Sequence, residues 1–291
     1  MRGYRVERPS TVKFEVSITD EAIVPLSTSS DDRDRIASMR EYFRNGPPHR
    51  GGADVSFADI VKLFGFNSVR IGRWVTAHEQ QVAANLFFDA LCDLQVILGV
   101  TESVISLRGS LSINYGIGGR LGASAHYIPS RRLLALAKNA GGGSLAHEWF
   151  HAFDHYIASH LFSSATQPGR FASKAWLLNE PVRPHTLNER LVLGFQRLFL
   201  SSDGQSASAL MKRCMAFDKA EGSYYFSMPE EVAARCFERV VQQQTLKNHF
   251  LVAGTLKSKT AELGLYPKQD EANAVAECWL DYFQSLGQAL K

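Results

Sequence analysis

The chain has 291 residues, a hydrophobic fraction of 45%, a charged fraction of 21% and a formal net charge of +3 at neutral pH. It is long enough to bury a large core, and its composition excludes fibrous, collagen-like and disordered proteins. The small basic excess is spread along the chain instead of forming a stripe, so charge gives little support for nucleic acid as a partner.

The sequence predicts a cytoplasmic protein without a membrane partner. No apolar stretch follows the first residues, as a secretory signal would require. No run approaches the roughly 18 apolar residues of a membrane span. The cysteines form no CxxC pair, so buried free thiols are expected instead of a disulfide framework. They are Cys92, Cys214, Cys236 and Cys278.

Residues 1–50 are expected to form an N-terminal arm or small subdomain. The strongest linker signal follows at 45–54, which is rich in glycine and proline. Residues 51–291 are then expected to form one α+β domain. Its first clear helix covers 76–100, where apolar residues recur at three- to four-residue spacing and Gly99 ends the run.

The stretch 102–138 predicts a small antiparallel or mixed sheet packed on a mainly helical body. Its β-like runs are 104–107, 111–113, 125–128 and 133–136, and a turn at Pro129 joins the last two as a hairpin. After residue 144 the apolar spacing becomes helical. The predicted helices cover 144–162, 187–200, 206–219, 229–244 and 270–288, and Ser144 is a candidate N-cap.

The helix predicted over 144–162 carries a metal-binding pattern. His147 and His151 are four residues apart, so both imidazoles lie on one helix face and can bind one zinc ion. Glu148 is rotated by about 100° from His147 and can act as a general base on a water at the metal. The competing interpretation is a surface helix with two unpaired histidines. It is disfavoured by the apolar far side of the helix, formed by Trp149, Phe153 and Tyr156.

A catalytic zinc site needs a third protein ligand and an open fourth position. The helix predicted to begin at Pro229 offers Glu230 and Glu231, and helical geometry does not choose between them. Two acidic residues in a first turn are equally well explained by the helix dipole. Just upstream, Tyr224 and Tyr225 are candidates for donating a hydrogen bond to an oxyanion, although core packing is the more ordinary role for either.

Several separated motifs occur in one order along the chain. They are 64–69, 74–75, 90–94, 125–129, 143–149, 248–252 and 266–267. Together they resemble the metallopeptidase-like large polyvalent protein-associated domains of phage and mobile-element proteins, and the stand-alone bacterial proteins labelled CLCA_X. The resemblance runs from about residue 60 to near the C-terminus, and it implies a zincin-like fold.

The segment 231–237 is similar to the E-F-F-A-E-A-F segment of the anthrax lethal factor type of zincin, in which the first Glu binds zinc. This similarity selects Glu231 over Glu230 as the third ligand. It also implies a catalytic tyrosine seven residues earlier, at Tyr224, with Tyr225 as the neighbouring alternative.

Three positions around the expected ligands set further expectations. Arg235 stands where the zincin segment has its second Glu, and Phe150 stands where a glycine usually follows the HEW motif. Phe150 is therefore expected to narrow or reshape the cleft. Asp154 lies on the histidine face and is expected either to accept an N–H from a ligand imidazole or to orient a neighbouring loop.

The first hypothesis is a zinc metallopeptidase acting on a protein or peptide substrate. Glu148 would take a proton from the attacking water, and Tyr224 would steady the oxyanion. The strand near 132–138 would align the substrate backbone. One Zn²⁺ would be held by His147, His151 and Glu231.

The alternative hypothesis is a catalytically inactive zinc-binding interaction module associated with mobile elements. In that case Asp154 or His155 would complete a set of four protein ligands. The number of protein ligands therefore separates the two hypotheses.

Overall fold

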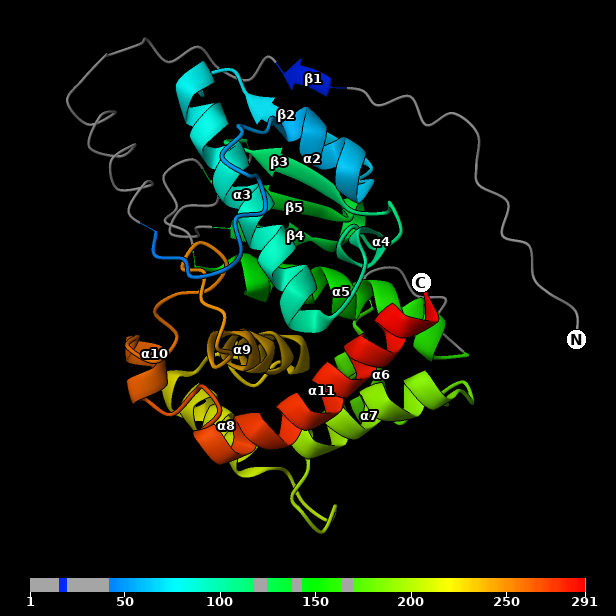
Figure 1. Cartoon of the computed structure of the whole chain (residues 1–291). Helices are drawn as coiled ribbons and strands as arrows, with labels where there is room; N and C mark the ends of the chain where they lie inside the picture. Colours follow the sequence, from blue (N-terminus) through cyan, green and yellow to red (C-terminus); the bar gives the residue numbers. More distant parts are fainter. Residues whose placement is uncertain (1–15, 20–41, 118–124, 138–142, 164–169, 291) are drawn as a thin grey trace, which may run out of the picture.

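The computed structural model describes residues 16–19, 42–117, 125–137, 143–163 and 170–290. Within these residues the fold is α+β, with a mixed sheet of short strands beside a mainly helical body (Figure 1). The predicted α+β class is confirmed, and of the two predicted sheet types the mixed one is present. Most of the expected arm, residues 1–50, lies outside the described residues.

The sheet has the strand order β1-β2-β3-β5-β4. The first four strands in this order run parallel, and β4 pairs antiparallel with β5. Every residue of β3 and β5 is buried, as expected for strands covered on both faces. The strands are β1 (Val16–Thr19), β2 (Ser68–Gly72), β3 (Ser112–Tyr115), β4 (Ala125–Ile128) and β5 (Leu133–Leu136).

One predicted strand is wrong. The run 104–107 overlaps α4 (Glu102–Ile105), a short helix whose Val104 and Ile105 are buried in the core. A short apolar run fits a buried helix or a strand equally well, and here tertiary packing favours the helix. Helix α2 and strand β2 were not predicted, although a capping box of Ser56 and Asp59 opens α2.

The predicted helices after residue 76 are present with small shifts at their ends. They are α3 (Ala77–Leu98), α5 (Leu145–Leu161), α7 (Thr186–Phe199), α8 (Ala209–Glu221), α9 (Pro229–Gln242) and α11 (Gln269–Ala289). Three further short helices complete the described part. They are α2 (Phe57–Phe64), α6 (Ala172–Leu177) and α10 (Lys259–Glu262).

Helix α3 is the one described helix that is long and apolar enough to cross a membrane by length and composition alone. In the fold it crosses the sheet in Figure 1, and it buries charged residues such as Asp93 together with its apolar side. A buried core helix passes the same test of length and hydropathy, so this is weak evidence for a membrane span.

The helical body is built on close approaches between helices. Helix α7 lies along α11 (Figure 1), and a Cβ on Gly194 would come within 2.2 Å of the Trp279 Nε1 atom, so only glycine allows this spacing. Helix α5 packs on α9, where the rings of Phe150 and Phe237 stack 4.6 Å apart. Phe150 is fully buried, so it fills the core and does not narrow a cleft as expected.

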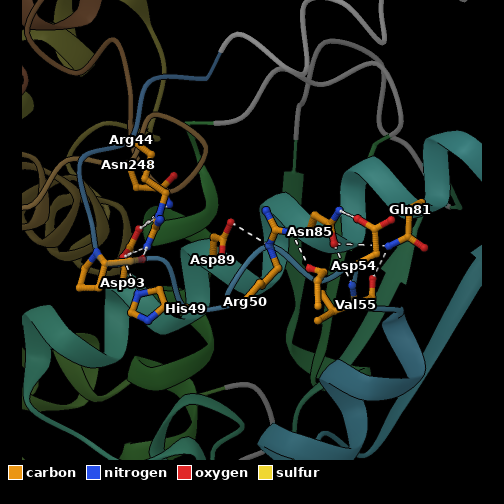
Figure 2. Close-up of polar contacts among 12 residues, drawn as sticks. Arg44, His49, Arg50, Asp54, Val55, Gln81, Asn85, Asp89, Asp93 and Asn248 are labelled. Atoms are coloured by element: carbon orange, nitrogen blue, oxygen red, sulfur yellow. Dashed lines mark hydrogen bonds and ion pairs between the residues drawn. The ribbon is translucent and has the colours of Figure 1, made fainter.

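The segment 42–56 lies against α3 and is held there by a fully buried carboxylate (Figure 2). Asp93 accepts hydrogen bonds from Arg44 Nε at 2.5 Å, His49 Nε2 at 2.8 Å and Asn248 Nδ2 at 2.8 Å. One turn earlier in α3, the Asp89 carboxylate accepts a hydrogen bond from Arg50 Nε at 3.1 Å. The buried negative charge is thus matched by donors from two distant segments, which it ties to one helix.

Replacing Asp93 by alanine is expected to lower the free energy of unfolding by about 3 kcal/mol, because the change leaves Arg44 and Asn248 without their shared acceptor. Urea denaturation measures this loss. The matched control is Asp281→Ala, which removes the partner of exposed Arg190 and is expected to cost less than about 1 kcal/mol. Equal losses in the two variants would contradict the prediction.

Candidate metal centre

Helix α5 begins at a junction that holds its histidines in place. The Ser144 side chain makes no capping hydrogen bond. Instead, the backbone N–H groups of Gly143 and Ala146 donate to the carbonyl oxygens of Phe250 and Leu251 at 2.8 and 3.0 Å. The first turn of α5 is therefore capped by a distant loop, which fixes the position of the helix.

Helix α9 supplies the third member of the site. Pro229 occupies its first turn, and Ala233 and Ala234 are fully buried, so the backbone of α9 can approach α5 closely. This packing directs Glu231 toward the histidine face of α5. The sequence places the three residues on two helices, and the close packing of these helices brings them together.

The structure gathers His147, His151 and Glu231 into one cluster of potential metal ligands. The Nε2 atoms of the two histidines lie 3.1 Å apart. Glu231 Oε2 lies 3.6 Å from His147 Nε2, and Glu231 Oε1 lies 3.5 Å from His151 Nε2. A tetrahedral zinc ion with nitrogen and oxygen ligands separates its donor atoms by roughly 3.3–3.6 Å. The spacing of the imidazole nitrogens and carboxylate oxygens is therefore compatible with a single zinc ion.

Glu230 is not part of this cluster. Its Oε2 atom is buried without a hydrogen-bond partner among the described residues, whereas the Glu231 carboxylate lies between the two imidazoles. Of the two candidates that helical geometry left open, the structure therefore brings Glu231 to the histidines.

A second carboxylate on α9 orients the first histidine. Glu238 Oε2 lies 3.2 Å from His147 Nδ1 and accepts a hydrogen bond from the Tyr266 hydroxyl at 2.8 Å. Its Oε1 atom accepts a hydrogen bond from the Thr255 hydroxyl at 2.8 Å. Such a contact fixes the ring so that Nε2 points at the metal position. This residue was missed as a site residue, although its seven-residue spacing from Glu231 indicates a shared helix face.

The electrostatics of the cluster favour a cation at its centre. Burial lowers the pKa of His147, but its hydrogen bonds with Glu231 and Glu238 outweigh this effect and raise the pKa to about 10. Burial raises the pKa of Glu231, but the two histidines lower it by more. The net result is a pKa below the usual range of a glutamate. Without a metal, a protonated imidazole thus supplies the positive charge that the carboxylates require.

Glu148 lies next to the cluster on the same helix. Its Oε2 atom accepts a hydrogen bond from the backbone N–H of Tyr127 in β4 at 2.7 Å. Burial raises the pKa of Glu148, and the nearby His147 and His151 only partly oppose this. The carboxylate is therefore oriented by a strand, and its pKa lies above the usual range of a glutamate.

Among the described residues, strand β4, not the strand near 132–138, is the edge of the sheet beside the metal cluster. Both sides of β5 are occupied, by β3 and by β4. The N–H of Tyr127 points away from β5 toward α5, since it donates to Glu148. The expectation that residues 132–138 align a substrate is corrected here, because an interior strand has no backbone groups left to pair.

The two candidate tyrosines are placed differently. Tyr224 is 72% exposed, and Tyr225 is 47% exposed. The pKa of Tyr225 is raised, first by burial and then by the negative charge of Glu231, with a smaller contribution from Glu148. The loop that carries both is shaped by buried Asp218, which accepts the N–H of Ser227 at 2.7 Å. Of the two tyrosines, Tyr225 is thus the one whose hydroxyl interacts with Glu231.

Asp154 and His155 have other partners. The Asp154 carboxylate accepts the backbone N–H of Ser173 at 2.8 Å and its hydroxyl at 2.5 Å, which positions the start of α6. His155 Nδ1 lies 2.7 Å from the Tyr127 hydroxyl. Of the two roles expected for Asp154, orientation of a neighbouring segment is the one present. Neither residue belongs to the ligand cluster.

Arg235 stands behind the third ligand. Its Nη1 atom lies 3.8 Å from Glu231 Oε2, and its Nε atom donates to the carbonyl oxygen of Leu265 at 3.1 Å. The guanidinium is almost fully buried. A cation thus supports the carboxylate from the side away from the histidines, where the zincin segment has a second acidic residue.

Residues 217–290 match the family model of large polyvalent protein-associated domain 1. The matched segment contains Glu231, Glu238 and Tyr266, and it supports the predicted relation to this group of domains. His147, Glu148 and His151 lie outside it. No curated protein and no solved structure matches the chain.

Zinc binding is expected to release about one proton per ion near pH 7.5, because the pKa of His147 is raised to about 10 and a metal ligand must be neutral. Zinc affinity should therefore rise with pH until the pH passes this pKa. Calorimetry in two buffers of different ionisation enthalpy counts the protons.

Glu238→Gln provides the control for this measurement. It removes one of the carboxylates that raise the pKa of His147, so it is expected to release fewer protons. Proton release close to zero in the unaltered protein would contradict the expectation that His147 is protonated before zinc binds.

Proposed function

We propose that the chain is a zinc-dependent peptidase of the zincin type. The observation that carries this proposal is the triangle of donor atoms from His147, His151 and Glu231, with the Glu148 carboxylate beside it. Catalytic zinc sites have three protein ligands and an open position, whereas structural sites have four. Three ligands in the described part favour an enzyme over a zinc-binding interaction module.

A zinc ion in this triangle would polarise a substrate carbonyl and lower the pKa of the attacking water. Glu148 would accept the proton of that water and pass it to the leaving amine. Its contact with the Tyr127 N–H holds the carboxylate in one orientation, so little reorganisation is needed at the moment of reaction. Glu238 would keep His147 in the tautomer that leaves Nε2 free for the metal.

The substrate in this proposal is an extended peptide. The free edge of β4 lies next to α5, and its Tyr127 N–H already points to the general base. The Tyr127 N–H is already used by Glu148, so a peptide would pair with the other outward backbone groups of β4, which would bring its backbone to the metal centre. Recognition through backbone groups gives binding that depends little on side-chain identity.

Tyr225 is the oxyanion donor in this proposal, in place of Tyr224. Its hydroxyl lies beside Glu231, and a phenol whose pKa is raised keeps its proton and donates a hydrogen bond. Negative charge that develops on the carbonyl oxygen during attack would strengthen this hydrogen bond.

Glu148→Gln is expected to retain zinc and to lose peptide cleavage by roughly 10²–10⁴-fold, since the amide cannot accept the proton. Zinc content is measured by elemental analysis, and cleavage is measured by mass spectrometry of a mixed peptide library. Glu230→Gln, a neighbouring carboxylate outside the cluster, is the matched control and should cleave normally. A zinc-loaded wild-type protein that cleaves nothing in the library would favour the inactive module instead.

Tyr225→Phe is expected to lower kcat by roughly 10²–10³-fold with unchanged zinc content, because it removes only a donor to the transition state. Tyr224→Phe makes the same chemical change one residue away, in a side chain exposed to solvent, and should leave kcat near the wild-type value. The reverse pattern, with loss at Tyr224 alone, would return the assignment to that residue.

A further inference from the structure

A cavity lies against helix α5, away from its paired histidines. It has a volume of about 390 Å³, within the range of roughly 300–1,000 Å³ that is typical of small-molecule sites. Phe153 and Ile157 of α5 line it, and both are turned well away from the face that carries His147. The end of α11 and the start of α7 complete the walls, and the C-terminal end of α11 lies beside α4 in Figure 1.

The floor of the cavity is apolar and held in place by the core. Phe153 is 2% exposed, and its ring packs 4.9 Å from Phe283. Ile157 and Leu107 are also buried, and Leu286 of α11 forms the opposite wall. Because these side chains are fixed by their other neighbours, the cavity is preformed and needs no rearrangement to accept an apolar group.

The rim of the cavity is basic. Arg108, His160 and His185 line it together with the apolar residues, and no acidic side chain is among the described residues that do so. The pKa of His160 is lowered, first by burial and then by the positive charge of Arg108, with Arg183 and Arg132 adding to it. Arg108 is therefore the cation of the rim, and no carboxylate among the described lining residues offsets its charge.

Arg108 is held at the rim by an unusual backbone. Leu107 and Arg108 have φ values of 53° and 56°, a conformation that non-glycine residues rarely adopt. The segment is kept in this form by hydrogen bonds such as Arg108 N–H to the Ser103 carbonyl at 2.6 Å. The result is that Leu107 faces the buried floor while Arg108 stays in solvent at the mouth. Strain of this kind concentrates at ligand sites.

His185 presents a hydrogen-bond donor at the same rim. Its Nδ1 atom accepts the backbone N–H of Leu187 at 3.1 Å at the start of α7. A neutral imidazole that accepts at Nδ1 carries its proton on Nε2. While this hydrogen bond is present, the ring can therefore donate from Nε2.

We propose that this cavity binds a small apolar molecule that carries one carboxylate. The apolar part would lie on Phe153, Ile157 and Leu286, and the carboxylate would pair with Arg108. Arg108 is the arginine of a lining that also offers the polar groups of His160, His185, Asn188, Tyr156 and Tyr282, so a single negative charge suits it. The site is independent of the metal centre, because the two lie on different faces of α5.

Calorimetry with decanoate, below its micellar concentration, tests the proposal on the full chain. Decanoate is expected to bind with a stoichiometry near one, and decanol is expected to bind at least tenfold more weakly. Arg108→Gln should weaken decanoate at least tenfold and leave decanol unchanged. Arg197→Gln, an exposed arginine on α7 that does not line the cavity, should change neither.

A second variant tests the same proposal in case Arg108→Gln does not fold. Leu286→Trp fills the cavity from a partly exposed helix position and should abolish binding of decanoate without loss of zinc or change in circular dichroism. No saturable binding, equal affinity for acid and alcohol, or unchanged affinity in both variants would overturn the proposal. A dimer that Leu286→Trp dissociates would overturn it in favour of a second copy of this chain on the same face.

Discussion

The packing of α9 across α5 is the contact on which the rest of the site depends. Fully buried Ala233 and Ala234 allow the two backbones to approach, and the stacked rings of Phe150 and Phe237 fix their register. Only this arrangement places Glu231 between two histidines that precede it by about eighty residues in the chain. The apolar part of the α5–α9 contact stabilises the fold by burying hydrophobic surface. At its polar end, several carboxylates lie close together, and their negative charges need positive partners.

That neutralisation explains the chemistry of the centre. Glu148, Glu231 and Glu238 surround His147 in a region with little solvent, where uncompensated charge is costly. A proton on His147 satisfies this demand in the metal-free protein, and a divalent cation would satisfy it more completely. Burial is also the largest cause that raises the pKa values of Glu148 and Tyr225, and in the proposed mechanism the first would accept a proton while the second would donate a hydrogen bond.

The metal centre is also tied to parts of the chain that touch no ligand. Asp93 on α3 binds Asn248 (Figure 2). The Oδ1 atom of Asn248 accepts the N–H groups of Phe250 and Leu251. The carbonyl groups of this loop cap the start of α5, and Thr255 just beyond holds Glu238. The orientation of His147 is thus set from both sides, by a capped helix and by a positioned carboxylate. Arg44 and His49 also bind Asp93, so their segment helps to hold this network in place.

The sequence by itself determined the helices after residue 76, the histidine pair with its glutamate, and the α+β class, because each follows from spacing within one short segment. Tertiary structure alone decided which groups meet. It brought Tyr225 to the site instead of Tyr224, made β4 the free edge instead of β5, and added Glu238 with its partners. Neighbouring residues on a loop have the same local pattern, and strand order depends on contacts across the whole domain. Only packing between distant segments therefore distinguishes these alternatives.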